Sequence, residues 1–428
     1  MTMLAIFGTL LILLFTSVPI SVVIGLSVVA GLLVSGSTSM LMVAQNCFTA
    51  VDSFPLMGLP FYMLCGTLMI NGGTARQLVD FAKSLVGWIT GGLGIITTLS
   101  CIFFGAISGS APGTTAAIGS LMIPAMKKSG YSSELAAALT ACSGTIGVII
   151  PPSIPFVICG VSSGVSVADM FIAGIVPGIA IGLGLMVVTY IYARRGGLDA
   201  HHEAFSFRTV CKSLWEAKWA ILVPVIILGG IYSGIFTPTE SAVIACVYAM
   251  LVGFLINREL TLASFWSSLV DACLMTGTTL IINGISSAFG QLLTIERIPS
   301  TIATFMLGIS DNVIIILLLI ILMLMFVGCF FETLSAIIIL TPIFLPVVKM
   351  YGVDPIHFGI ILVCGIAIGF VTPPLGTTLF LSAQLADTTL EKTLKYLLPY
   401  LLMMIGTLLL LTFIPELSMF LVQLLSTK

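Results

Sequence analysis

Charged side chains are scarce along the whole of this sequence. Lysine, arginine, aspartate and glutamate make up only 7% of its 428 residues, and hydrophobic residues make up 59%. Soluble domains carry about 25% charged residues. The mean hydropathy is +1.23 and the formal net charge is −2. These values exclude a water-soluble globular protein, argue against a nucleic-acid partner, and indicate a protein embedded in a lipid bilayer.

The residues that build metal sites, disulfides and hydrolytic centres are also sparse. There are three histidines, His201, His202 and His357, and the ten cysteines are scattered, mostly through apolar runs, without a CxxC pair. The sequence has no HExxH motif and no paired carboxylates within an apolar run. We therefore expect the cysteines to be packing residues and the protein not to be an enzyme.

Long apolar runs are abundant, and many can cross about 30 Å of hydrocarbon. They predict an all-α polytopic membrane protein. No basic segment precedes the first run, so we expect a retained span rather than a cleaved signal peptide. The predicted spans are 2–18, 20–35, 56–72, 133–163, 168–193, 218–235, 239–256, 270–292, 356–386 and 394–424.

Two further apolar regions, 89–127 and 312–348, are interrupted centrally by GAISGSAPGTT and GCFFETLS. We interpret each as a re-entrant hairpin, because non-helical backbone at membrane depth must be surrounded by protein or water. If the first opens to the cytoplasm and the second to the opposite side, twelve of the 15 lysines and arginines are cytoplasmic, in agreement with the positive-inside rule. The N-terminus is then outside, with Arg297, Lys349 and Lys428.

The sequence repeats itself at a spacing of 222 residues. An ungapped alignment pairs Gly147 with Gly369, and Pro151–Pro152 with Pro373–Pro374. Ser132 and Asp354 both precede predicted helix starts as N-caps. The predicted number of crossings between the two Pro-Pro pairs is odd, so we expect two copies of one unit in opposite orientations. Further identical pairs are Phe104 and Phe326, Pro124 and Pro346, Lys127 and Lys349, Gly130 and Gly352, Cys142 and Cys364, and Pro177 and Pro399.

Each Pro-Pro pair interrupts a predicted span inside the membrane. The residue before a proline is disfavoured in a helix, so we expect helices to end at Ile150 and Thr372 and to restart from Ser153 and Leu375. Freed carbonyls can replace part of the hydration shell of a cation such as Na⁺, and the positive ends of the restarted helices suit a carboxylate. Secondary transporters use paired broken helices in inverted repeats to build a site near the midplane.

Four stretches resemble the signature stretches of the large membrane subunit (M subunit, DctM/SiaM-like) of tripartite ATP-independent periplasmic (TRAP) transporters. They are GAISGSAPGTTAAIGSLMIPAM, GTIGVIIPPSIPFVICG, GIFTPTESAVIACVYA and GFVTPPLGTTLFLSAQLA. The resemblance covers nearly the whole chain. It implies an elevator-type fold with two re-entrant hairpins and two broken helices, like that of the ion transporter superfamily. It also implies import of an organic acid of the sialic acid or C4-dicarboxylate class, coupled to two or more Na⁺ ions.

The same resemblance implies partners and a location. The partners are a small four-helix membrane subunit (Q-type) and a periplasmic substrate-binding protein (P-type), and the location is the bacterial inner (cytoplasmic) membrane. No further spans precede the first one, so we expect the small subunit to be a separate chain. The sequence departs from the family at PPLGTT, where many relatives read Pro-Pro-Val-Gly-Leu-Asn, and Thr377 and Thr378 therefore leave the substrate class open.

The family pattern implies one Na⁺ site at each hairpin tip and helix break, with substrate between them. The residues implied for the first Na⁺ site are Ser108, Ser110, Gly144, Gly147 and Pro151. Those for the second are Gly328, Thr333, Gly369, Thr372 and Pro373. Those for the substrate are Ser153, Thr377 and Glu332.

Two acidic residues receive different interpretations. Glu332 is the acid at the second tip, and a carboxylate inside a membrane is costly and usually functional. We expect it to contribute to the substrate site or to ion or proton coupling. Glu240 follows Thr237 and Pro238 in a predicted capping box, so we expect it only to start a span.

The resemblance divides the chain into four segments. Residues 1–88 are expected to hold scaffold spans and a first arm helix, and 89–194 the first half of a transport domain. Residues 195–311 are expected to hold a cytoplasmic loop, scaffold spans and a second arm helix, and 312–428 the second half of the transport domain. The predicted arms are TARQLVDFAKSLVGW and LTLASFWSSLVDACL, which have helical apolar spacing.

Two other functions remain open at this point. One is a stand-alone Na⁺/carboxylate symporter of related architecture, which uptake without a binding protein would favour. The other is an intramembrane enzyme, which the missing motifs argue against.

Overall fold

The computed structural model describes residues 1–14, 18–196, 205–310, 312–329, 331, 333–373 and 376–426, and within these ranges it contains helices and no strand. The predicted all-α fold is confirmed. The helices are α1 (Thr2–Leu14), α2 (Ile20–Ser35), α3 (Leu41–Val51), α4 (Leu59–Asn71), α5 (Thr74–Val86), α6 (Gly92–Ser108), α7 (Ala111–Lys128), α8 (Ser133–Gly144), α9 (Ile154–Ser163), α10 (Val167–Gly196), α11 (Phe207–Tyr232), α12 (Pro238–Leu251), α13 (Leu262–Ile295), α14 (Ile298–Ile309), α15 (Val313–Gly328), α16 (Thr333–Met350), α17 (Pro355–Gly369), α18 (Thr377–Leu385), α19 (Leu390–Phe413) and α20 (Pro415–Ser426).

Short turns extend some of these helices. The 3₁₀ turn η1 (Phe54–Gly58) leads into α4, the 3₁₀ turn η2 (Thr145–Val148) follows α8, and the π-helical turn η3 (Val252–Ile256) continues α12. With these extensions, seven described segments are long and apolar enough to cross a membrane. The protein is therefore a multi-pass membrane protein. The seven are 54–71, 167–196, 207–232, 238–256, 262–295, 333–350 and 390–413.

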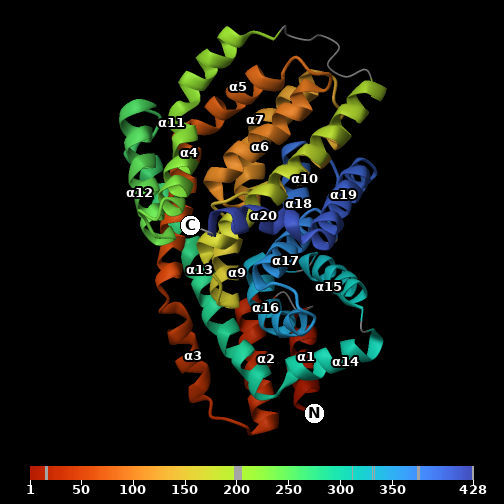
Figure 1. Cartoon of the computed structure of the whole chain (residues 1–428). Helices are drawn as coiled ribbons and strands as arrows, with labels where there is room; N and C mark the ends of the chain where they lie inside the picture. The colour runs from red at the N-terminus through yellow and green to blue at the C-terminus, as the bar shows by residue number, and fades with distance from the viewer. Residues whose placement is uncertain are drawn as a thin grey trace.

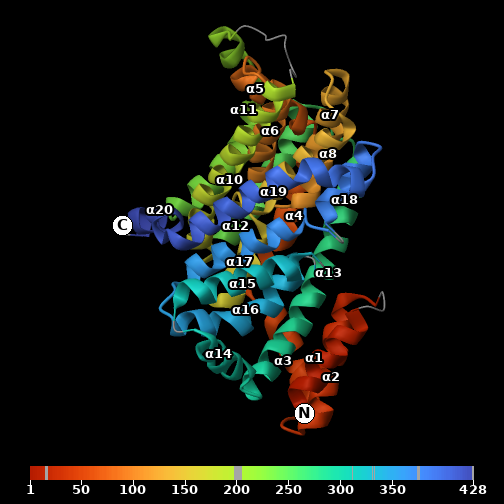
Figure 2. The same cartoon turned by 90° about the vertical axis from the view of Figure 1, so that its right-hand side faces the viewer.

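The two predicted hairpins lie in opposite halves of the molecule. Helices α6 and α7 occupy the upper half of Figure 1 and α15 and α16 the lower half, and Figure 2 shows the same after a quarter turn. The N-terminus lies at the lower end, away from α5 and α7. The hairpin helices are joined by very short tips, because α6 ends at Ser108 and α7 begins at Ala111, and α15 ends at Gly328 and α16 begins at Thr333.

The helix boundaries follow the internal repeat closely. Helix α7 spans 111–128 and α16 spans 333–350, which is the same helix displaced by 222 residues. Both predicted N-caps are present: the Ser132 hydroxyl accepts from the Leu135 N–H at 3.2 Å, and Asp354 Oδ1 accepts from the Ile356 N–H at 2.7 Å. The units diverge at their ends, because Pro415 removes a helical N–H and separates α19 from α20, whereas α10 runs unbroken for 30 residues.

Both helix breaks exist, but they begin earlier than the sequence analysis expects. Helix α8 ends at Gly144 and α17 at Gly369, not at Ile150 and Thr372. The chain tightens before it reaches the prolines: η2 is a 3₁₀ turn, and the Thr372 N–H donates to the Gly369 carbonyl three residues earlier at 3.0 Å. Tightening of the last turn into i→i+3 bonds is a common way for a helix to end.

The second predicted arm is continuous with the span that follows it. The predicted second arm, 260–274, and the predicted span 270–292 overlap, and both belong to the 34-residue helix α13. A capping box between Thr261 and Ser264 starts this helix, and no glycine or proline occurs before Gly277 to interrupt it. Helices α3 and α14 were not expected. Helix α13 packs against α2, α3, α4 and α16, so it connects the first spans to the second hairpin.

The helices before the breaks form the centre of the molecule. All residues of α8 from Leu135 to Gly144 and all residues of α17 from His357 to Gly369 are buried. A helix that is apolar and buried on every side belongs in the interior of a bundle. The first break is buried as well, from Thr145 to Ser153, so protein surrounds it, as non-helical backbone at membrane depth requires. In the second break Val371 is buried, whereas Thr372 is half-buried and Pro373 is exposed.

Candidate functional site

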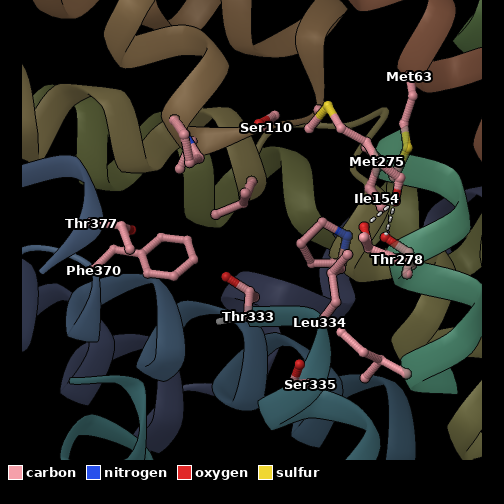
Figure 3. Close-up of a pocket in the computed structure, with 17 residues that line it drawn as sticks. Met63, Ser110, Ile154, Met275, Thr278, Thr333, Leu334, Ser335, Phe370 and Thr377 are labelled. Carbon is pink, nitrogen blue, oxygen red and sulfur yellow. Dashed lines mark hydrogen bonds between the residues drawn. The ribbon is translucent and has the colours of Figure 1, made fainter. Parts of the chain in front are cut away.

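A cavity of about 390 Å³ lies where the hairpin tips meet the helix breaks (Figure 3). The tips contribute Gly109, Ser110, Ala111, Pro112, Thr333, Leu334 and Ser335 to its lining. The breaks contribute Val148, Ile154, Pro155, Phe370 and Thr377. The remaining lining residues are Met63 of α4 and Met275, Thr278, Thr279 and Ile282 of α13. The structure thus brings both tips and both breaks, which are far apart in sequence, to one place.

Four helices begin at this cavity. The first residues of α7, α9, α16 and α18 are Ala111, Ile154, Thr333 and Thr377, and all four line it. A helix N-terminus presents free N–H groups and a positive partial charge. None of the described lining residues carries a charged side chain. The cavity therefore favours an anion through backbone dipoles rather than through lysine or arginine.

In the first half, the hydroxyl groups below the hairpin tip form a closed network. The Ser108 and Thr114 hydroxyl oxygens lie 2.7 Å apart, and the Ser108 hydroxyl donates to the Ser110 carbonyl at 3.3 Å. The Ser110 hydroxyl accepts from the Gly113 N–H at 3.3 Å and so caps α7. Three oxygens of neutral groups are thereby gathered at the tip, and a hard cation such as Na⁺ prefers oxygen ligands of this kind.

Two glycines of the first break let the backbone approach this network. A Cβ atom at Gly147 would lie 2.3 Å from Thr114 Oγ1 and 2.6 Å from the Ser110 carbonyl oxygen. A Cβ atom at Gly144 would lie 1.8 Å from Thr115 Oγ1. Both glycines are thus required by close packing against the hairpin, and Gly147 contacts the predicted Na⁺ ligands directly.

In the second half, two backbone segments pack directly against each other. A Cβ atom at Gly369 would lie 2.4 Å from the backbone carbon atoms of Gly328, and one at Gly328 would lie 2.9 Å from the Ile366 carbonyl oxygen. The structure thus brings the predicted Gly328 and Gly369 together. Thr372 lies close by in sequence, and its hydroxyl donates to the Ile368 carbonyl at 2.9 Å.

Two hydroxyl groups of the second hairpin have no hydrogen-bond partner among the described residues. They belong to Thr333 and Ser335, which are 1% and 0% exposed. Both line the cavity, and Figure 3 shows them on one wall, opposite Ser110. A buried unpaired hydroxyl is costly, and these two are the buried unpaired hydroxyls that line the cavity, which makes them candidates to bind a ligand or ion there.

Other predicted site residues have different surroundings. Ser153 is fully buried and its hydroxyl accepts from the Phe156 N–H at 3.4 Å, so it caps α9 just behind the cavity. Pro151 is buried and Pro373 is exposed at the two breaks. Glu332 lies outside the described residues. Glu240 forms the predicted capping box with Thr237 and does not line the cavity.

The wall formed by α13 was not expected from the sequence. Thr278 and Thr279 lie there, and their hydroxyls donate to the Met275 carbonyl at 2.9 and 2.8 Å. The only sequence signal was the polar run Thr276–Thr279 in an apolar helix. That signal is weak, because threonine hydroxyls in membrane helices commonly bond the preceding turn.

Comparison with known proteins gives a consistent assignment. Residues 7–417 match the model of the family described as "Tripartite ATP-independent periplasmic transporter, DctM component". The chain is 45% identical over 97% of its length to the isethionate TRAP transporter permease protein DctMQ of Oleidesulfovibrio alaskensis, and spans 65% of that protein. It is 40% identical to the C4-dicarboxylate TRAP transporter large permease protein DctM of Pseudomonas aeruginosa, over 92% of each chain. It is 37% identical to the sialic acid TRAP transporter large permease protein SiaM of Vibrio cholerae, over 96% of each chain.

Two solved transporter structures share the fold. The YdaH transporter of Alcanivorax borkumensis matches with a TM-score of 0.65 at 14% identity, over 87% of both chains. MtrF of Neisseria gonorrhoeae matches with a TM-score of 0.52 at 15% identity, over 90% of this chain and 85% of its own.

Proposed function

This chain belongs to the DctM component family of tripartite ATP-independent periplasmic transporters, and we propose that it is the large membrane subunit of a Na⁺-coupled importer of an organic acid. Membership of a transporter family agrees with the expectation that it is not an enzyme. The relatives named above are associated with isethionate, C4-dicarboxylates and sialic acid, so the substrate is an organic anion of one of these kinds.

The observation that carries this proposal is the convergence of four helix N-termini on one uncharged cavity. An acid that enters this cavity leaves water, and its charge must be compensated inside the protein. The helix N-termini supply part of the compensation. Bound Na⁺ supplies the rest, so the anion and the cation favour each other's binding.

We place one Na⁺ ion at the first tip, with the oxygen atoms of Ser108, Ser110 and Thr114 and the carbonyls of the break near Gly144, Gly147 and Pro151. A second ion lies at the second tip, near Gly328, Thr333, Gly369, Thr372 and Pro373. The close approach of Gly147 and Gly369 to the hairpins supports both assignments. Two ions or more are therefore transported with each substrate molecule.

We propose that transport follows an elevator mechanism. Residues 89–194 and 312–428 form the moving transport domain, and residues 1–88 and 195–311 form the scaffold. The cavity supports this division, because it lies between the scaffold helices α4 and α13 and the two hairpins. Helix α5, which packs against α6 and α11, is the arm that joins the scaffold to the first hairpin.

The proposal includes two partner proteins and a location. A small membrane subunit packs against the scaffold, and a periplasmic binding protein delivers the acid to the outer face. The assembly resides in the bacterial inner membrane, with α5 and the end of α7 on the cytoplasmic side. The basic residues Arg76, Lys83, Lys127 and Lys128 at these positions support that orientation.

Uptake into proteoliposomes tests this function. The chain is reconstituted with its small subunit, a Na⁺ gradient is imposed, and the uptake of radiolabelled isethionate, succinate and sialic acid is measured with and without the binding protein. We expect uptake of at least one acid that requires Na⁺ and both partners. Uptake by the chain alone would support the stand-alone symporter instead, and uptake that is unchanged when choline replaces Na⁺ would contradict Na⁺ coupling.

A further inference from the structure

The hydroxyl groups of the cavity differ in what they can offer a ligand. Thr333 and Ser335, on α16, have no hydrogen-bond partner among the described residues, so both hydroxyl protons are free to be donated. On α13, Thr278 and Thr279 already donate their protons to the Met275 carbonyl. Their oxygens can therefore only accept a further hydrogen bond. One wall of the cavity donates and the other accepts.

The donor wall suits an anionic group. Carboxylate and sulfonate oxygens accept hydrogen bonds and donate none. The first turn of α16 carries Thr333 and Ser335, and α18 begins at Thr377 after Gly376 with no side-chain cap on its first N–H groups. By contrast, the serines Ser110 and Ser153 cap α7 and α9. The free donors of the cavity are thus concentrated in the second half.

The acceptor wall suits a hydroxyl group on the ligand. A substrate O–H can donate to Thr278 or Thr279, whereas a second anionic group there would meet lone pairs and no positive charge. Much of the remaining lining of the cavity is apolar and includes Met275, Leu334 and Phe370. A short hydrocarbon link fits that surface, and the many hydroxyls of a sugar acid would lose their hydrogen bonds to water there.

We propose that the substrate is a short organic monoanion with a hydroxyl group at the opposite end, bound through its anionic group to Thr333 and Ser335 and through its hydroxyl to Thr278 and Thr279. This inference rests on the proposed function and narrows its substrate class. A C4-dicarboxylate would place its second carboxylate against the acceptor oxygens of α13, where no positive charge compensates it. Sialic acid would place several hydroxyl groups against the apolar lining, where they lose their hydrogen bonds to water. The two α13 threonines are specificity-determining residues, because they touch the part of the substrate that distinguishes one acid from another.

Isothermal titration of the purified full-length chain in lipid nanodiscs tests this inference. The ligands are 2-hydroxyethanesulfonate, ethanesulfonate, succinate and N-acetylneuraminate, each measured in NaCl and in choline chloride. We expect 2-hydroxyethanesulfonate to bind in NaCl about fivefold more tightly than ethanesulfonate, which lacks the hydroxyl, because one hydrogen bond is lost. This comparison uses the unmodified protein and does not depend on the folding of a variant.

Variants then test which wall binds the anionic group of the substrate and which binds its hydroxyl group. The double substitution T278V/T279V should remove the preference for the hydroxylated sulfonate, so that the two sulfonates bind with equal affinity. The double substitution T333V/S335A should weaken the binding of both sulfonates about tenfold or more. The matched control is Ser286→Ala, because Ser286 is a buried unpartnered serine on α13 that does not line the cavity. It should leave all four affinities unchanged.

The outcomes separate this inference from the proposed function. If succinate or N-acetylneuraminate binds more tightly than 2-hydroxyethanesulfonate in NaCl, the narrowed substrate class is wrong and the Na⁺-coupled site stands. If the preference for the hydroxylated sulfonate survives T278V/T279V, the role of α13 is wrong. If no acid binds in NaCl while the complete transporter shows Na⁺-dependent uptake, the inference about this cavity is wrong and the proposed function stands. If the complete transporter takes up no acid either, both are overturned.

Discussion

The two halves of the molecule share the 222-residue sequence repeat, with α7 and α16 at matching positions, and they differ at the cavity. In the first half, the hydroxyls of Ser108 and Thr114 bond each other and Ser110 caps its helix. In the second half, the hydroxyls of Thr333 and Ser335 have no partner within the described part of the chain. The same order of helices therefore provides a hydrogen-bonded oxygen cluster in the first half and hydroxyl groups with unused protons in the second half.

This difference indicates that the two halves bind different ligands. A preformed cluster of oxygens suits a small cation, because little reorganisation is needed when the ion replaces its water shell. Open donors suit an anion that completes their hydrogen bonds on arrival. In our account the first half binds mainly Na⁺, and the second half binds the acid together with a further ion.

The largest expected effect comes from the glycines at the breaks. Gly369→Ala should abolish Na⁺-dependent uptake in proteoliposomes, because the new Cβ would lie 2.4 Å from the backbone of Gly328, which cannot move aside as a side chain can. Gly147→Ala should also reduce uptake, but less, because its closest contact is the Thr114 hydroxyl at 2.3 Å and its nearest backbone contact, the Ser110 carbonyl oxygen, is further away at 2.6 Å.

The matched control for these glycines is Gly406→Ala, which has no atom within 4 Å of its Cβ position and should retain full uptake. Equal uptake by the Gly369 variant and this control would show that the second break is not tightly packed in the working protein. A larger loss for Gly147 than for Gly369 would reverse the comparison between the halves.

An intermediate effect is expected for the closed oxygen cluster. Thr114→Val removes one oxygen that lies 2.7 Å from the Ser108 hydroxyl, and we expect the Na⁺ concentration for half-maximal uptake to rise about tenfold. That change equals the loss of about 1.4 kcal/mol of binding free energy. Titration of uptake against Na⁺ at a saturating acid concentration measures it.

Ser120→Ala serves as the control on the same helix, because Ser120 bonds the Ala117 carbonyl and does not line the cavity. An unchanged Na⁺ requirement in the Thr114 variant would remove the first half from the ion site. A change in acid affinity alone would assign this cluster to the substrate instead.

The smallest effect is expected at the base of the first hairpin. Lys127 at the end of α7 donates to the Ala386 carbonyl at 2.9 Å and lies 3.8 Å from the Asp387 carboxylate. Lys127→Met should lower the maximal uptake rate about twofold, because a partly exposed contact of this kind contributes little. Its repeat counterpart Lys349 forms no ion pair with a described residue, so Lys349→Met should have no effect on the rate. A larger loss for Lys349→Met than for Lys127→Met would show that contacts at the end of α16 matter more for the uptake rate than those at the end of α7.

Much of the fold could be predicted because its signals are local in the sequence. The Pro-Pro pairs, the glycines before them and the polar hairpin tips each constrain the backbone within a few residues. The exact helix ends could not be predicted, because the tightening at Thr145–Val148 depends on how the last turn packs and not on proline alone. The extent of α13 as one helix was not predicted for a related reason, since a few polar residues do not end a helix that has tertiary contacts along its length.

The site was predicted in part, for reasons of the same kind. Ser110, Thr333 and Thr377 were singled out because they lie at tips or breaks, and the structure brings all three to one cavity, while their roles in binding stay predictions. Thr278 and Thr279 were not, because only the packing of α13 against α16 brings them to the cavity. The unpaired state of Ser335 could not be predicted either, since it depends on which neighbours lie within reach of the hydroxyl.

The most direct test of the central claim is a cryo-electron microscopy map of the complete transporter with Na⁺ and the transported acid. Our account predicts density for the acid in the cavity between Thr333 and Thr278, below the tip that carries Ser110. Density for the acid elsewhere, such as in the cavity formed by Ser53–Pro55 and Thr237–Thr239, with none between the tips and breaks, would contradict it.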